Sequence, residues 1–204
     1  LFALLVTAAN GNTEKVIFLA PASSQHSFPI SSSLLESFDP NVLSPNRSTA
    51  RKALPVAFPT TDTPRGLEYW YLLRHLNEAQ RYEVRVCWVA SQPTEFWLDV
   101  FELSNLPPSS PAALEFKRLL EDASASSTRE TSSESVLALR VQAAADFYTS
   151  NQTLMQYPPP VNLDIILDPY FANVFPTSLG PTAVYITVLA ILGWYISDWI
   201  WSHL

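Results

Sequence analysis

Apolar and polar residues alternate along several short stretches of the chain, and this is the pattern of half-buried β-strands. The clearest stretch is 81–90, in which every second residue from Tyr82 to Trp88 is an aromatic residue or a valine. Further strands are predicted at 15–20, 66–76, 95–103, 135–143 and 161–167, with an extended segment at 53–58. About six or seven short strands separated by proline-bearing loops predict an antiparallel β-sandwich.

The spacing of these runs also predicts how some strands pair. A short polar connection separates the runs at 66–76 and 81–90, so the sequence predicts a hairpin there. The turn at 91–94 leads into the run at 95–103, which would extend the hairpin into a meander. The run at 66–76 is apolar on most of both faces, which indicates a strand covered on both sides.

One helix is predicted within the body of the chain, at 111–123. Ser110 is a suitable N-cap and Pro111 fits the first helical position. The serine-rich stretch at 124–135 is too polar to fold alone, so we expect a mobile loop. The segment at 21–65 has little periodicity outside 53–58, and we expect a long, partly ordered excursion.

The last part of the chain is continuously apolar. Residues 182–201 carry one charge, Asp198, and are about as many as a helix needs to cross a hydrocarbon core of about 30 Å. Aromatic residues lie near its ends, where lipid headgroups would be. We expect a transmembrane helix at 182–201 and a cytosolic tail at 202–204. The alternative is a buried helix of a soluble domain.

The first residues, L-F-A-L-L-V-T-A-A, are typical of the end of a secretory signal sequence. We expect a signal-peptide remnant at 1–9, with a buried N-terminal strand as the alternative. Two N-glycosylation sequons, which begin at Asn46 and Asn151, agree with a translocated body. The expected organisation is a single-pass type I protein of the endoplasmic reticulum membrane, with a lumenal β-sandwich at 12–167 and with Asn46 and Asn151 as the expected glycosylation sites.

One side of the expected membrane helix is small and polar, which is typical of a helix that packs against other helices. The residues of this side are Ala183, Thr187, Ala190, Trp194, Ser197, Asp198 and Trp201. An ionised carboxylate costs about 2.5–3.5 kcal/mol at the centre of a span and less near its end. Asp198 therefore needs a partner or, alternatively, lies at the cytosolic headgroups. The segment at 168–181 is rich in proline and aromatic residues, and we expect a stiff joint that contacts a partner through Tyr170, Phe171 and Phe175.

Composition and charge exclude several functional classes. The chain has 12 Lys and Arg against 19 Asp and Glu, so it offers no basic surface to a nucleic acid. Its four glycines form neither a phosphate-binding loop nor a nucleophile elbow. One cysteine and three scattered histidines do not suggest a metal cluster, and His75 is better explained as a structural residue. The sequence predicts no catalytic residue, cofactor or metal.

Three motifs resemble a known family: N-T-E-K-V-I-F-L-A-P at 12–21, Y-W-Y-L-L-R at 69–74, and D-P-Y-F-A-N-V-F-P-T-S-L at 168–179. Together with a single C-terminal span, they resemble the fungal co-activator subunit of GPI mannosyltransferase II. The resemblance implies a non-catalytic glycoprotein that binds and stabilises a polytopic mannosyltransferase of the endoplasmic reticulum. That partner would hold the dolichyl-phosphate mannose site and add the second mannose to GPI precursors.

Three other functions stay open from the sequence. A GPI-anchored protein also has a signal and a hydrophobic tail, but the tryptophan-rich end, Asp198 and the lack of a polar spacer disfavour it. A cargo receptor of the secretory pathway would carry a coiled-coil stalk, which is not visible. A lumenal hydrolase or transferase would need a catalytic constellation that the residues do not suggest.

Overall fold

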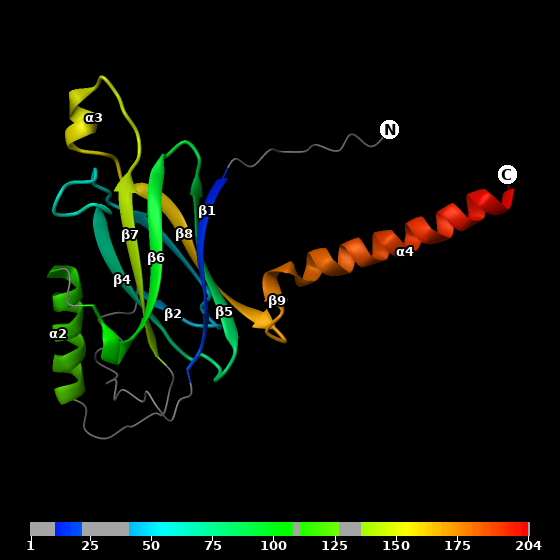
Figure 1. Ribbon diagram of the computed structural model, residues 1–204, viewed down its shortest axis with the longest axis horizontal. Coiled ribbons are helices and arrows are strands. Elements are labelled where there is room, and N and C mark those ends of the chain that lie inside the picture. Colours follow the sequence, from blue (N-terminus) through cyan, green and yellow to red (C-terminus); the bar gives the residue numbers. More distant parts are fainter. Residues whose placement is uncertain (1–10, 22–40, 108–110, 127–135, 204) are drawn as a thin grey trace.

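The computed structural model describes residues 11–21, 41–107, 111–126 and 136–203. The expected signal-peptide remnant at 1–9 and most of the serine-rich stretch at 124–135 lie outside the described residues. Figure 1 shows two packed sheets, a helix against the outer side of one sheet, and a long terminal helix that projects away from the opposite side. The chain is therefore mostly β with one apolar C-terminal helix, which confirms the predicted fold class.

The described strands form two sheets. In the first sheet the order is β1-β5-β8-β3, with β9 paired to β8, and in the second it is β2-β4-β7-β6. The pairs are antiparallel except for β2 and β4, which run parallel. The strands are β1 (Gly11–Leu19), β2 (Val42–Leu43), β3 (Thr49–Leu54), β4 (Leu67–Leu73), β5 (Arg81–Val89), β6 (Thr94–Glu102), β7 (Leu137–Ala145), β8 (Val161–Phe171) and β9 (Phe175–Pro176).

Helices join or follow these strands at five places in the described chain. Helix α2 confirms the predicted helix at 111–123 and continues three residues into the serine-rich stretch, while α4 begins two residues before the predicted span. The short helix α3 follows an N-cap that the sequence analysis did not identify: the amide of Thr153 donates to Asn151 Oδ1 at 3.0 Å. The bounds are η2 (Leu103–Asn105), α2 (Pro111–Ser126), α3 (Gln152–Gln156), η3 (Thr177–Leu179) and α4 (Gly180–His203).

The predicted hairpin between 66–76 and 81–90 is wrong. Strand β4 pairs with β2 and β7, whereas β5 pairs with β1 and β8, so the connection between them crosses from one sheet to the other. Strand β6 pairs with β7 instead of β5, and the predicted meander is therefore wrong as well. The alternation of apolar and polar residues shows which face of a strand is buried. It does not show which of several strands with the same pattern pairs with it.

The main core lies between the two sheets and consists of the inward residues of the alternating runs. Tyr82, Val84 and Val86 of β5 are fully buried there, opposite Leu139 and Val141 of β7. These are the positions at which the period-two pattern places apolar side chains.

A second, smaller core explains why β4 is apolar on both faces. Helix α2 covers the outer face of β4 and β7, and the ring of Phe116 stacks on Trp70 with centroids 5.1 Å apart. Leu72 and Ala138 are fully buried beneath the same helix. Among the described residues, no α-helix lies along the outer face of the opposite sheet (Figure 1).

Gly66 lies at the start of β4 with a φ of +69°, close to the backbone of β7. A Cβ atom at this position would collide with the carbonyl oxygen of Ala143. We predict that Gly66→Ala lowers the free energy of unfolding by about 2 kcal/mol or more, because a non-glycine residue in such a backbone costs about 1–3 kcal/mol before the collision is counted. Thermal unfolding of the full chain in detergent measures the loss of stability.

Gly180→Ala is the matched control for this substitution. A Cβ atom at Gly180 would meet no other atom within 4 Å, so we expect little change. Equal destabilisation by the two substitutions would contradict the explanation by backbone conformation and close approach.

Candidate functional site

The segment that leads into α4 is a hairpin that begins inside the first sheet. Strand β8 continues to Phe171, turns, and returns as β9 before η3 leads into the helix. Ala172 and Asn173 have φ values of 49° and 59°, and the amide of Val174 donates to the Phe171 carbonyl at 3.0 Å. Two consecutive positive φ angles define a turn that glycine and asparagine usually form. Because alanine is unusual at such a position, this hairpin is not apparent from the sequence.

The side chain of Asn173 fixes this turn to the body of the sandwich. Its Oδ1 atom accepts from the amide of Arg81 at 2.7 Å, and its Nδ2 atom donates to the Ala79 carbonyl at 2.9 Å. The side chain of Gln80 adds a bond from Nε2 to the Tyr170 carbonyl at 3.1 Å. The connection between β4 and β5 therefore holds the hairpin from one side.

A cluster of charged side chains lies next to this turn, on the outer face of β5 and β8. Glu83 and Asp168 are opposite each other in the strand register, and their side chains are only 4% and 7% exposed. Arg85 Nη1 lies 3.7 Å from Glu83 Oε1 and 3.8 Å from Asp168 Oδ2. Lys15 of β1 donates to Glu83 Oε2 at 3.1 Å. Two buried carboxylates are therefore balanced by two cations.

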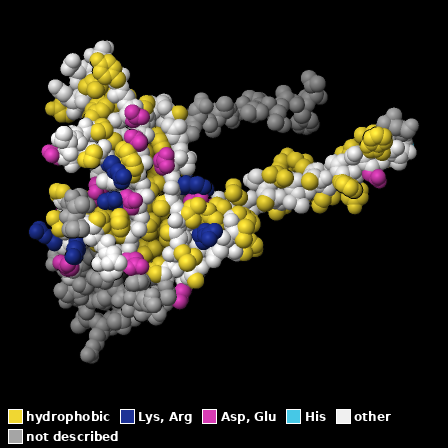
Figure 2. All heavy atoms as spheres, in the orientation of Figure 1, with side chains coloured by type: hydrophobic (Ala, Val, Ile, Leu, Met, Phe, Trp, Pro, Cys, Tyr) yellow, Lys and Arg dark blue, Asp and Glu magenta, His cyan; other side chains and the backbone are white. Residues whose placement is uncertain are grey.

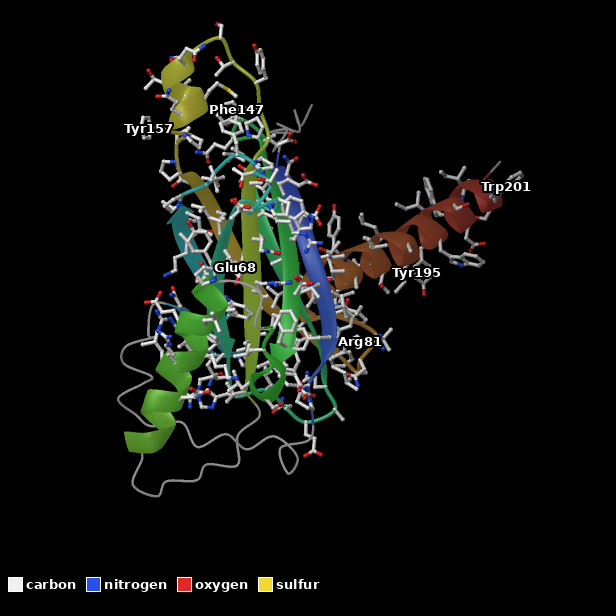
Figure 3. All side chains as sticks on the ribbon, turned by 60° about the vertical axis from the view of Figure 1, so that its left-hand side comes forward. Glu68, Arg81, Phe147, Tyr157, Tyr195 and Trp201 are labelled. Atoms are coloured by element: carbon white, nitrogen blue, oxygen red, sulfur yellow. The ribbon has the colours of Figure 1, made fainter. Side chains whose placement is uncertain are left out.

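The same cluster binds the start of the terminal helix. The amide of Ser178 in η3 donates to the Asp168 carboxylate at 3.3 Å, and Arg85 Nη2 donates to Ser178 Oγ at 3.3 Å. One residue earlier, the hydroxyl of Thr177 donates to the Pro169 carbonyl at 2.6 Å. The direction in which α4 leaves the sandwich is therefore set by contacts with the first sheet. Figure 3 shows Arg81, at the start of β5, near the base of this helix.

The structure places the three predicted contact residues of the junction differently. Tyr170 is buried: Arg81 lies over its ring at 5.8 Å, and its hydroxyl donates to Glu83 Oε2 at 3.3 Å. Burial, together with the negative charge of Glu83, raises the pKa of Tyr170 above its usual value. Phe171 is exposed and Phe175 is half-buried, with their rings 5.7 Å apart.

The predicted residues of α4 are all exposed, and no residue of this helix is buried. Small and polar side chains share one side of it, as the sequence predicts from 100° per residue. They are Ala183, Thr187, Ala190, Trp194, Ser197 and Asp198. The two sequon asparagines, Asn46 and Asn151, are also exposed, the first in a turn before β3 and the second at the start of α3.

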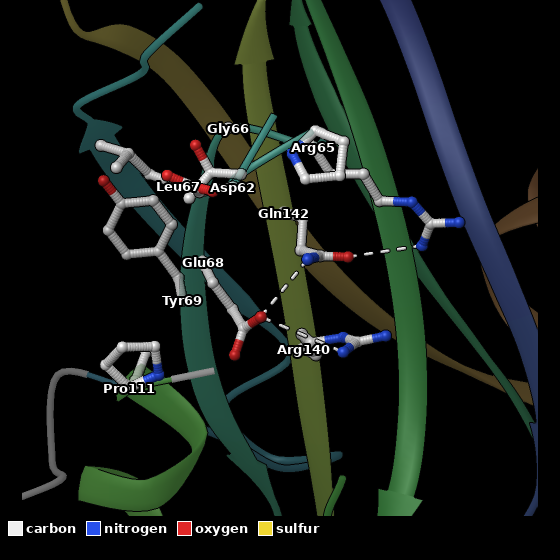
Figure 4. Close-up of a pocket in the computed structure, with 12 residues that line it drawn as sticks. Asp62, Arg65, Gly66, Leu67, Glu68, Tyr69, Pro111, Arg140 and Gln142 are labelled. Atoms are coloured by element: carbon white, nitrogen blue, oxygen red, sulfur yellow. Dashed lines mark hydrogen bonds and ion pairs between the residues drawn. The ribbon is translucent and has the colours of Figure 1, made fainter. Parts of the chain in front are cut away.

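A pocket of about 590 Å³ lies on the other side of the sandwich, over β4 and β7 beside the start of α2 (Figure 4). Glu68, Arg140 and Gln142 form part of its lining, and Gln142 Nε2 donates to Glu68 at 3.3 Å. Arg140 pairs with Asp99 at 2.6 Å, and Arg65 donates to Gln142 at 3.4 Å. These charges are balanced within the network, and no residue selected from the sequence as a contact lies there.

Sequence analysis missed the residues that join the helix to the sandwich. In the sequence, Glu83 and Arg85 could be recognised only as polar residues of an alternating strand. Asn173 could be recognised only as part of the third motif. Their partners lie far away in sequence, so no local signal could have identified the junction. The number of ionisable side chains on one strand face was the only available indication.

Comparison with known families gives a match over nearly the whole chain. The family model described as GPI-mannosyltransferase II co-activator matches residues 2–199. No curated protein and no solved structure matches the chain. The matched region includes the junction and almost all of α4.

The charged cluster leads to a stability prediction. We expect Arg85→Gln to lower the free energy of unfolding by about 3 kcal/mol, because it leaves Glu83 and Asp168 buried with too little positive charge. Arg51→Gln is the matched control: Arg51 bonds Asp164 at 2.8 Å on the same sheet face, but its side chain is 84% exposed. An exposed pair contributes little to stability, because water screens its charges. Denaturant unfolding measures the free energy of unfolding of both variants. Equal losses in the two variants would contradict the prediction.

Proposed function

The chain belongs to the GPI-mannosyltransferase II co-activator family (Pga1), and from this we propose that it is a non-catalytic subunit of that enzyme. In this proposal it binds and stabilises a polytopic catalytic partner, which transfers the second mannose to GPI precursors in the endoplasmic reticulum. The observation that carries the proposal is the family match over residues 2–199. The match favours this function over a GPI-anchored protein, a cargo receptor or an independent hydrolase.

We propose that α4 crosses the membrane and that the sandwich lies in the lumen. The helical stretch Thr177–His203 contains an 18-residue window with a mean hydropathy of 1.6 and is long and apolar enough to span. Twenty-four residues of α4 extend about 36 Å, against a hydrocarbon core of about 30 Å. A lumenal location is compatible with the two sequons, because Asn46 and Asn151 are exposed and therefore accessible to glycosylation.

The partner is proposed to pack on the small and polar side of α4. Lipid tails are as apolar as leucine, so membrane helices associate through small residues and polar contacts instead of general hydrophobicity. Ala183, Thr187 and Ala190 allow close approach, and Trp194, Ser197 and Asp198 offer polar groups to a neighbouring helix. Tyr170 acts indirectly in this proposal, because it is buried and holds the junction, while Phe175 lies beside the base of the helix.

The hydrogen bonds at the junction explain how the sandwich could act on a partner that binds α4. The bonds from Ser178 to Asp168 and from Thr177 to Pro169 connect the helix to the sheet without a flexible stalk. A partner bound to α4 therefore also has the sandwich held at a defined position beside its lumenal side. Such a subunit stabilises an enzyme by position, with no catalytic group of its own.

Replacing residues 182–201 with an unrelated single transmembrane helix tests the proposed function. We expect the abundance of the catalytic subunit to fall and precursors that lack the second mannose to accumulate, because the docking side of α4 is lost. Immunoblotting and analysis of GPI lipids in cells measure both effects. The proposal is overturned if mannose transfer and the abundance of the partner stay unchanged while the swapped chain is present at normal level.

A finer prediction concerns the two sides of the helix. The double substitution Ala190→Leu and Ser197→Leu fills the proposed contact side, and we expect about a tenfold loss of co-purified partner, which corresponds to about 1.4 kcal/mol. Val188→Leu and Leu192→Phe add bulk on the opposite side and serve as the control. Pull-down in mild detergent measures both. Equal losses from the two sides would contradict the proposed docking side.

A further inference from the structure

Exposed apolar side chains gather where α4 leaves the sandwich. Ile17 and Leu19 of β1 are 47% and 59% exposed, and Phe171 and Val174 of the hairpin are 63% and 72% exposed. We call these four residues the junction patch. Figure 2 shows hydrophobic side chains, with basic ones among them, around the base of the terminal helix. Exposed apolar residues grouped in this way mark a surface that contacts something other than water.

The two residues of β1 belong to the outer face of the first sheet. Ile17 lies opposite Glu83 and Leu19 lies opposite Arg81 in the strand register, whereas their neighbours Val16 and Phe18 pack against the main core. Helix α2 covers the other sheet, and α4 projects from the side opposite α2 (Figure 1). The face that carries Ile17 and Leu19 is therefore the one from which the helix departs.

The length of α4 fixes how far this face lies from the membrane. If about 20 residues of the helix cross the hydrocarbon core, Gly180 lies at its lumenal boundary, inside a headgroup layer about 5–7 Å thick. Thr177 and Ser178 come directly before that boundary, and they are bonded to Pro169 and Asp168. The hairpin is additionally held through Asn173. The hairpin cannot move away from the bilayer without breaking these hydrogen bonds.

The chemistry of the surface suits phospholipid headgroups. Phe171 and Val174 supply apolar side chains at a depth where aromatic and aliphatic groups are favourable. Arg81 is exposed between Leu19 and Tyr170, and its guanidinium is a bidentate donor that matches phosphate oxygens. A basic side chain next to apolar ones is the combination that binds a membrane surface.

We propose that the junction patch rests on the lumenal phospholipid layer, with Phe171 and Val174 at the boundary of the acyl chains and Arg81 bonded to lipid phosphates. This rests on the part of the proposed function in which α4 spans the membrane. The lipid contact sets the orientation of the sandwich, and hence which side of α4 meets the partner. The pocket over β4 and β7 then faces away from the bilayer, because it lies on the other sheet.

Fluorescence quenching on the full chain in phospholipid nanodiscs, without any partner, tests this contact. In a Cys87→Ser background, single labels are placed through Val174→Cys, Leu19→Cys and, as an exposed control at the end of the sandwich, Tyr148→Cys. We expect the labels at positions 174 and 19 to be quenched by headgroup nitroxide lipids. They should also be protected several-fold from aqueous iodide relative to the label at position 148.

A label placed through Gly193→Cys, in the middle of α4, separates the two proposals. If acyl-chain nitroxides quench that label while the label at position 174 is as open to iodide as the control, the lipid contact is overturned and the span stands. If the Gly193 position is not in lipid, the span and the contact both fail. Protection of position 174 that appears only after the mannosyltransferase is added would also overturn the lipid contact, since the occupant would be protein.

The role of Arg81 has its own control. Arg81→Gln is expected to reduce headgroup quenching of the Leu19 label severalfold in bilayers that contain phosphatidylserine. Arg51→Gln removes an equal charge from β3, at the far edge of the same sheet from β1, and is expected to leave that quenching unchanged. An equal reduction by both variants, or by neither, would overturn the phosphate contact.

Discussion

The arrangement of this molecule depends on Arg85, which lies between two buried carboxylates. Glu83 and Asp168 face each other on neighbouring strands, and without a cation between them their repulsion and loss of water would oppose the pairing of β5 with β8. Asp168 also accepts a hydrogen bond from the amide of Ser178, so a carboxylate that Arg85 balances within the sheet also holds the start of the helix. The stability of the sandwich and the position of the helix therefore share one interaction.

This coupling suits a co-activator that works by position. A flexible stalk would let the sandwich diffuse around the helix, and binding of the helix would then place nothing beside the partner. Here, hydrogen bonds donated by Thr177, Ser178 and Asn173 connect the segment before the helix to two different parts of the sandwich. Helix and sandwich can therefore act as one body, and in the proposed arrangement one side of it faces the membrane while the side with the charged pocket faces away.

The motifs that suggested the family also have structural explanations. The first motif forms β1, and the second forms β4, where Trp70 packs beneath α2 and the Tyr69 hydroxyl donates to the Pro55 carbonyl at 2.8 Å. The third forms the hairpin in which Asn173 and Asp168 make the contacts described above. These residues were recognisable as motifs, but what each side chain binds could not be read from them.

The sequence by itself determined the local elements: the alternating strands, helix α2, the apolar terminal helix and its small and polar side. Each of these follows from residues two, three or four positions apart, whose spacing decides which face of an element avoids water. Only the tertiary structure decided that β4 and β5 lie in different sheets, that Tyr170 is buried, and that Arg85 bridges two carboxylates. These features depend on contacts between distant residues, such as Tyr170 and Glu83 at a separation of 87 positions, and local periodicity carries no information about such pairs.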